Sequence, residues 1–281
     1  MNILVLYPKV KTEYQIIFTT MINGIKNNPG ISTSLFEVNK HTTPGEVESW
    51  IERSNGQVLV TLGKRSFNIS TQITSRMPAI TGGMVTPIGT NSGISLMGDP
   101  LQFTSYLNML APKVKRIHIV YSEKNSGWLM PKISMAAKRY NLEVIAQKAE
   151  TVQQAALAFQ KILRSSDLKS DALWLLMDRV IPDAAILPSI LKTVWEKNLV
   201  VLSSNPGHVK RGILFALYPD YEKMGKEIAI LAIKSLNNPT GPTILPTKDM
   251  RSAINVRTAS HLGLNITPKI LRRFNLIFPS P

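Results

Sequence analysis

The chain has 281 residues, no cysteine and a formal net charge of +15, with 44% hydrophobic and 18% charged residues. This length suits two domains of roughly 100–150 residues each, and the composition is that of a globular protein rather than a disordered one. The absence of cysteine excludes disulfide bonds, thiolate metal sites and a cysteine nucleophile, and no apolar run approaches the ~18–20 residues of a membrane-spanning helix.

Short apolar runs alternate with amphipathic stretches along the first hundred residues. We predict strands at 2–7, 31–38, 57–62, 78–81 and 93–97, and helices at 13–27, 44–54 and 64–75. Thr43 is placed to cap the helix that starts at Pro44, and the run from Asn28 to Gly30 ends the first helix. Strands separated by helices pair in parallel, because a crossover helix brings the next strand back alongside.

The same alternation restarts at Asp99. We predict helices at 99–110, 128–140, 152–165, 181–197 and 221–236, and strands at 116–121, 142–147, 171–176, 199–202 and 212–217. Two such series predict an α/β fold of two Rossmann-like lobes. Lobe 1 comprises 1–97 and about 219–250, and lobe 2 comprises 98–218 and about 251–281. Ligands of open α/β sheets sit beyond the carboxyl ends of the strands, so we expect a cleft site between the lobes.

Several segments carry a family resemblance in their order and spacing. They are the run from Pro112 to Tyr121, Asn125-Ser126, the run from Tyr140 to Val144, the run from Val209 to Gly212, Tyr218-Pro219-Asp220-Tyr221, Met224-Gly225-Lys226, the run from Ile254 to Ala259, and Leu262-Gly263-Leu264. Together they resemble the ABC-transporter substrate-binding protein family typified by the tryptophan-binding lipoproteins. The resemblance covers nearly the whole chain and is strongest from about Gly93 onward.

This resemblance implies a type I periplasmic-binding-protein fold whose parallel-sheet lobes are joined by a multi-strand hinge. It also implies an amino-acid-like, possibly aromatic, solute and a permease in the membrane as partner. The sequence departs from the family at two loops. The strand that ends at Tyr121 is followed by Ser-Glu-Lys-Asn rather than an Asn-Pro pair, and Asp178-Arg179 stands where an Asp-Asn pair is frequent. Both loops lie where ligand contacts are expected.

The candidate ligand-binding residues share one property, which is that they follow the carboxyl ends of predicted strands. In the first lobe they are Tyr7, Gly63, Thr81 and Gly82; in the second they are Tyr121, Asn125, Ser126, Asp178, Arg179, Ser203, Ser204, Asn205, Tyr218 and Asp220.

Each polar candidate has a functional and a structural interpretation. Ser126 and the run from Ser203 to Asn205 either start helices whose N–H groups bind a ligand carboxylate, or are simple N-caps. Asp178 either pairs with a ligand ammonium or forms a surface pair with Arg179, which is itself a candidate for the carboxylate. Asp220 orients the ligand or caps the next helix. The tyrosines stack on a planar solute, and Tyr121 is alternatively a wall of the core.

No catalytic or metal-binding pattern emerges from the sequence. The four histidines are far apart, and neither a Ser–His–Asp set nor a metal-ligand spacing can be assigned, so we expect no enzyme, no cofactor and no metal. The positive charges are dispersed, with the densest cluster at Lys113, Lys115 and Arg116, so we expect no nucleic-acid partner.

These observations predict a monomeric solute-binding component of an ABC transporter. The alternative is an extracytoplasmic sensor that feeds a membrane kinase or chemoreceptor; an α/β enzyme and a DNA-binding regulator are less well supported. The first residues read as a strand and not as a signal peptide, so the chain is either cytoplasmic or a periplasmic or extracytoplasmic protein whose signal peptide has been removed. The resemblance favours the periplasmic or extracytoplasmic location.

Overall fold

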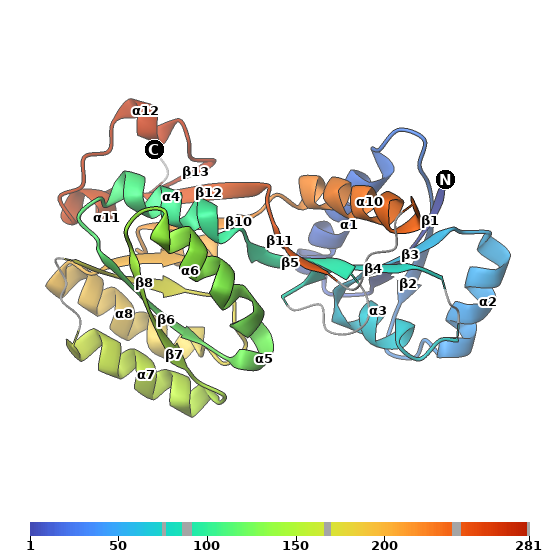
Figure 1. Cartoon of the computed structure of the whole chain (residues 1–281), viewed down its shortest axis with the longest axis horizontal. Helices are drawn as coiled ribbons and strands as arrows, with labels where there is room; N and C mark the ends of the chain where they lie inside the picture. The colour runs from blue at the N-terminus through green and yellow to red at the C-terminus, as the bar shows by residue number, and fades with distance from the viewer. Residues whose placement is uncertain (75–76, 86–91, 166–169, 238–242, 280–281) are drawn as a thin grey trace. The chain divides into compact units, whose positions relative to one another are not determined.

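The chain forms two compact α/β units (Figure 1). The computed structural model describes residues 1–74, 77–85, 92–165, 170–237 and 243–279. The first unit comprises Met1–Leu96 and Pro219–Asp249, and the second comprises Met97–Tyr218 and Met250–Pro281, so the chain passes between the units three times. Each unit is built on a mostly parallel sheet, which confirms the predicted fold class.

The described part of the first unit holds a six-stranded sheet in the order β11-β5-β4-β3-β1-β2. Its strands are β1 (Asn2–Pro8), β2 (Ser32–Val38), β3 (Val58–Leu62), β4 (Ala79–Met84), β5 (Ser92–Gly98) and β11 (Ile244–Thr247), and its helices are α1 (Thr12–Lys26), α2 (Pro44–Ser54), α3 (Gly63–Ser70) and α10 (Tyr221–Asn237). The pairs β1–β2, β1–β3, β3–β4 and β4–β5 are parallel.

Helices cover both faces of this sheet, and the strand sequence shows why. Successive side chains of β1 point to opposite faces, so Ile3 and Val5 pack with α1 and α10, while Leu4 and Leu6 pack with α2 and α3. Right-handed crossovers place α1 on one face and α2 and α3 on the other, because β2 lies on one side of β1 and β3 on the other.

The described part of the second unit holds a seven-stranded sheet in the order β13-β12-β10-β9-β8-β6-β7. Its strands are β6 (Arg116–Tyr121), β7 (Glu143–Lys148), β8 (Asp171–Leu175), β9 (Val200–Ser203), β10 (Phe215–Pro219), β12 (Met250–Asn255) and β13 (Leu276–Phe278). Its helices are α4 (Pro100–Leu110), α5 (Glu123–Ser126), the 3-10 turn η1 (Gly127–Leu129), α6 (Met130–Lys138), α7 (Val152–Ser165), α8 (Asp183–Lys197), α9 (Pro206–Lys210), α11 (Val256–His261) and α12 (Pro268–Leu271).

A buried charged cluster lies at the amino ends of β6 and β8. Asp171 is 1% exposed, and its carboxylate contacts Arg116 Nε at 2.5 Å and His118 Nε2 at 2.9 Å. The amino ends of parallel strands lie at the edge opposite the expected ligand edge, so this cluster belongs to the frame of the second unit.

Several element boundaries differ from the sequence prediction. The helix expected at 64–75 ends at Ser70, where the Ser70 and Thr71 hydroxyls bond to the carbonyls of Phe67 and Asn68, and Thr74 N bonds to Glu48; residue 75 lies outside the described residues. The helix expected at 128–140 is divided into η1 and α6 and ends at Lys138, and the short helix α5 precedes it. The short elements β11 and β13 were not predicted, and α9 was expected only as a helix start at the run from Ser203 to Asn205.

A carboxyl group on α10 gives a pH-dependent prediction for the stability of the first unit. Burial and the nearby charge of Asp249 raise the pKa of Glu227, although its carboxylate accepts a bond from the Lys248 backbone. A raised pKa means that the folded state favours the protonated acid, so the charged form destabilises the fold as pH rises above the ordinary value of 4.5.

Glu227→Gln should therefore raise the melting temperature at pH 8, and the gain should vanish as pH falls below about 4. Glu222→Gln, which removes an exposed charge from the same helix, is the control. A gain for Glu227→Gln that is equal at both pH values would contradict this prediction.

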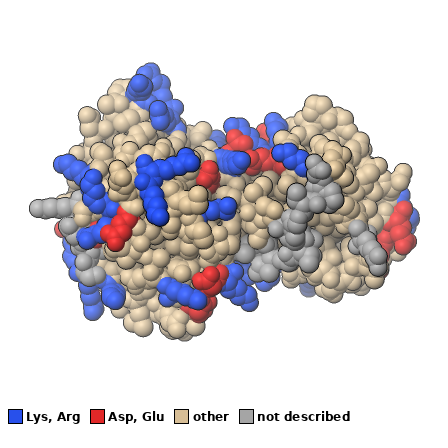
Figure 2. All heavy atoms as spheres, in the orientation of Figure 1, with Lys and Arg blue, Asp and Glu red and all other residues tan. Residues whose placement is uncertain are grey.

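The basic residues are spread over the surface. On the face shown in Figure 2, Lys and Arg side chains lie in several separate groups, some of them beside Asp or Glu. Within the described residues, no helix has the length and apolar character needed to cross a membrane.

Candidate functional site

The carboxyl edge of the second sheet gathers most of the predicted site residues. Strands β6, β8, β9 and β10 are joined by parallel pairings, so their carboxyl ends meet at one edge. Tyr121 ends β6, Ser203 ends β9, and Tyr218 is the penultimate residue of β10. The loop after β8 brings Asp178 to the same edge. Both tyrosines are half-buried, which leaves part of each ring accessible.

Asp178 is the centre of a buried hydrogen-bond cluster at this edge. The side chain is 8% exposed, and its carboxylate accepts bonds from Ser122 N at 2.9 Å, Ser122 Oγ at 3.3 Å and Asn125 Nδ2 at 3.1 Å. The Ser126 hydroxyl and Val180 N, the latter at 3.1 Å, also donate to it. A carboxylate offers about four lone-pair sites, so five donors use its full capacity to accept hydrogen bonds. Asp178 therefore holds the loop after β6 in place.

The loop after β6 starts a short helix in a way that the sequence did not reveal. Ser122 is the N-cap of α5, and its hydroxyl accepts a bond from Asn125 N at 3.2 Å. Ser126 was expected to cap a helix. It is the last residue of α5 and precedes η1, but its hydroxyl bonds to Asp178 and to the Ser122 carbonyl instead of capping. Its buried hydroxyl therefore supports the loop and does not point to solvent.

A second polar cluster lies at the end of β9. Ser203 Oγ is 2.9 Å from His208 Nδ1 and accepts a bond from Asn205 N at 3.1 Å. His208 Nε2 lies 3.3 Å from an oxygen of Asp183, which is at the start of α8. Asn205 caps α9, as one of the two interpretations expected, by accepting a bond from Gly207 N at 2.8 Å. Ser204 N bonds to the Leu175 carbonyl, which ties the loop to β8.

The arrangement of Ser203, His208 and Asp183 was not predicted from the sequence. The sequence feature that could have indicated it is the five-residue interval between Ser203 and His208. Asp183 comes from another helix, and no sequence pattern connects it with the other two residues. Ser203 is 1% exposed, and its hydroxyl already accepts a bond from Asn205 N. A nucleophile must be able to reach its substrate, so the cluster is suited to fixing the loop after β9 rather than to attacking a carbonyl.

Among the candidates of the first unit, Tyr7 lies near the carboxyl end of β1 and Gly63 directly follows β3, whereas Thr81 and Gly82 lie within β4, which continues beyond the predicted end to Met84. Tyr7 is half-buried, and burial together with the charge of Glu37 raises the pKa of its hydroxyl. Thr81 is fully buried and its hydroxyl bonds to that of Thr61 at 3.0 Å, so it faces a neighbouring strand. A Cβ on Gly82 would lie 2.3 Å from Ile228 Cδ1, which gives this glycine a packing role against α10.

The remaining predicted residues lie at helix starts or on the surface. Gly63 begins α3 with a φ of +76°, a left-handed conformation that favours glycine. Asp220 accepts a bond from Lys223 N at 3.2 Å, which is the capping role for α10. Arg179 is exposed, and within the described residues it forms no ion pair with Asp178. Trp128, in η1, has a buried indole N–H with no acceptor among the described residues.

The described residues contain no group of three His, Asp or Glu side chains that is able to hold a metal ion. The polar groups at the carboxyl edge are instead backbone N–H groups, hydroxyls, amides and tyrosine rings. Such a set can bind a small polar solute with a planar part.

The two mostly parallel sheets define an α/β fold of the type I periplasmic binding proteins. Two solved structures share it. One is an ABC domain in complex with L-Trp from Streptococcus pneumonia, at 17% identity and a TM-score of 0.61, with 99% of each chain covered. The other is a ligand-free, open substrate binding protein with adhesive properties from Clostridium difficile, at 18% identity and a TM-score of 0.65, with 98% of each chain covered.

The family of the chain is identified from its sequence. Residues 56–275 match the ABC transporter substrate binding protein family, and the chain belongs to it. A tyrosine-binding protein of Clostridioides difficile (strain R20291) is 28% identical over 181 residues, which are 61% of this chain and 51% of that protein. The chain thus spans about half the length of this curated relative.

Proposed function

We propose that this protein binds a small zwitterionic amino acid with an aromatic or apolar side chain and delivers it to a membrane permease. We further propose that it is monomeric and works outside the cytoplasm without turnover of the solute. Membership of the substrate-binding family supports the transport role. The names of a tyrosine-binding relative and of a neighbour in complex with L-Trp support an amino acid as solute.

The observation that carries the proposal is the fixed polar edge of the second sheet. The Asp178 and His208 clusters hold the loops after β6 and β9, which carry Asn125 and Asn205, at the same sheet edge as the half-buried Tyr121 and Tyr218. A rigid polar frame at an edge that also carries tyrosine rings suits a zwitterion with a flat side chain, because polar groups fix its orientation and a ring adds stacking. Tyr7 and Gly63 are the corresponding candidates of the first unit.

A thermal-shift series with matched ligands tests this proposal. A solute at about 100 times its Kd adds ~2.7 kcal/mol of stability, which corresponds to a rise of about 5–10 °C in melting temperature. We expect phenylalanine, tyrosine or tryptophan to give this rise. Phenethylamine, which lacks the carboxylate, and phenylpropionate, which lacks the ammonium, should give little.

Two outcomes would overturn the proposal. A rise with a purine or an inorganic anion, and none with any amino acid at millimolar concentration, would assign another solute. Chemical change of the amino acid during incubation, read by mass spectrometry of the recovered ligand, would make the protein an enzyme.

A further inference from the structure

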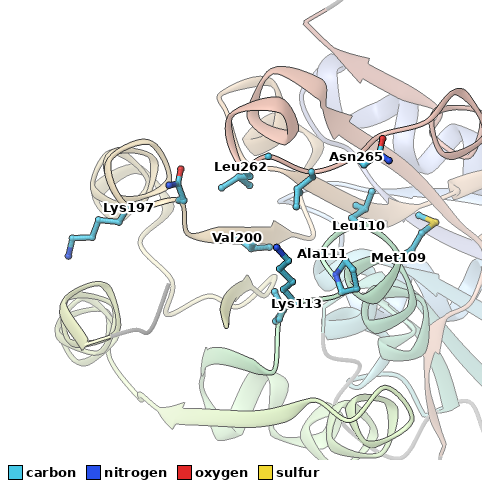
Figure 3. Close-up of a pocket in the computed structure, with 13 residues that line it drawn as sticks. Met109, Leu110, Ala111, Lys113, Lys197, Val200, Leu262 and Asn265 are labelled. Atoms are coloured by element: carbon cyan, nitrogen blue, oxygen red, sulfur yellow. The ribbon is translucent and has the colours of Figure 1, made fainter. Parts of the chain in front are cut away.

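A hollow lies in the second unit, at the edge of the sheet opposite the candidate site. Its volume is about 820 Å³, and it is bordered by residues 109–114 after α4, by the junction of α8 and β9, and by residues 262–265 after α11 (Figure 3). Strand β9 starts at Val200 in this hollow and ends at Ser203 in the candidate site. The two sites are thus separated by the length of that strand, about 10 Å.

Among the described residues, the lining of the hollow is mostly apolar and contains no carboxylate. Its apolar side chains come from Leu110, Ala111, Val114, Val200, Leu262 and Leu264. Both the volume and the lining are typical of small-molecule sites, which are ~300–1,000 Å³ clefts with a few polar groups. The hollow therefore suits a ligand with an apolar body.

Lys113 gives the hollow a charge preference. In Figure 3 its side chain extends from the turn after α4 toward Val200, and within the described residues no ion pair involves it. The second lysine of the lining, Lys197, points away, and its amine donates to the Leu163 carbonyl at 3.3 Å. One ammonium beside an apolar lining, with no acid among its described residues, complements one negative charge on an apolar chain.

We propose that this hollow binds an amphiphilic monocarboxylate, with its apolar tail against the partly exposed Leu262 and Leu264 and its carboxylate on Lys113. The tail gains from leaving water, and the carboxylate gains an ion pair that a neutral or cationic head group does not form. This site is distinct from the proposed solute site, because it uses the amino end of β9 and none of the residues at the carboxyl edge.

Calorimetric titration of the full chain with three eight-carbon probes tests the proposal. We expect octanoate to bind more tightly than octanol, and octylamine to bind most weakly. Lys113→Met should weaken octanoate binding about five-fold and leave octanol unchanged, which is the size expected of a solvent-exposed ion pair. Lys115→Met, which removes an exposed lysine two residues along the chain, is the matched control. Lys113→Glu should reverse the preference between octanoate and octylamine.

Three results would each overturn the proposal: no binding of octanoate, equal binding of octanoate and octanol, or equal losses in Lys113→Met and Lys115→Met. Lys113 and Lys115 are exposed, so the variants Lys113→Met, Lys113→Glu and Lys115→Met should fold normally, and an unchanged melting temperature would show that they do. Amino-acid binding at the carboxyl edge should be unaltered in these three variants, so failure of this site leaves the proposed transport function standing.

Discussion

Replacing Asp178 with alanine should lower the free energy of unfolding by about 2–5 kcal/mol and abolish solute binding. The substitution removes the acceptor of two buried backbone N–H groups, those of Ser122 and Val180, and of the Ser126 hydroxyl. Each buried donor left without a partner costs about 1–3 kcal/mol. The loop after β6 would lose its anchor, and Asn125 and Tyr121 would lose their fixed positions. Urea unfolding and a thermal shift with amino acids measure the two effects.

A control separates this effect from the ordinary loss of an aspartate in the same unit. Asp99 caps α4 by accepting a bond from Leu101 N at 3.0 Å, so Asp99→Ala should cost about 1 kcal/mol and leave solute binding intact. Equal costs for the two substitutions would mean that the Asp178 cluster contributes no more than a helix cap.

Asp178→Asn distinguishes anchoring of the loop from direct contact with the solute. The carboxylate already accepts from five donors, so we expect the variant to lose affinity equally for an amino acid and for its desamino analogue. A loss confined to the amino acid would instead assign the ligand ammonium to Asp178, the role that the sequence suggested.

The fold was predictable where local chemistry agreed with the hydrophobic pattern. Helix α2 has the predicted bounds because Thr43 and Glu46 cap each other, with Thr43 N donating to Glu46 at 2.7 Å, and because Asn55 ends it in a left-handed conformation. The segment after Ser70 kept a helical pattern of apolar residues, yet its hydroxyls bond to carbonyls of the preceding turn and end α3. Helix α9 was expected only through its start at the run from Ser203 to Asn205, because a five-residue helix that begins Pro-Gly has no apolar periodicity from which its bounds could be predicted.

The site was predictable one residue at a time, but not as a set of contacts. The residues after each strand were selected because the carboxyl ends of parallel strands hold ligands. Which loops meet depends on the order of the strands, and that order is a property of the whole sheet. Strand β6 lies between β7 and β8, so the loop at Ser122 meets Asp178 across 56 residues of sequence. His208 and Asp183 meet in the same way, from α9 and the start of α8.

Replacing Gly225 with alanine should destabilise the first unit by about 3 kcal/mol. Helices α1 and α10 touch where Gly24 and Gly225 lie, and a Cβ on Gly225 would stand 2.0 Å from the Met21 carbonyl oxygen. This distance is impossible for real atoms, and the obstacle is the backbone of a helix rather than the end of a flexible side chain. The helices must therefore separate, which loosens Met21 and Met224 in the core between them.

The matched control is Gly45→Ala in α2, where an added Cβ would meet nothing within 4 Å. Alanine favours a helix by roughly 0.5–1 kcal/mol over glycine, so this variant should be neutral or slightly more stable. Urea unfolding of both variants gives the comparison, with the slope of each transition checked so that the midpoints report stability. A cost below about 1 kcal/mol for Gly225→Ala would mean that the two helices are free to move apart. In that case the glycine in the Met224-Gly225-Lys226 segment would need another explanation than the close approach of α1 and α10.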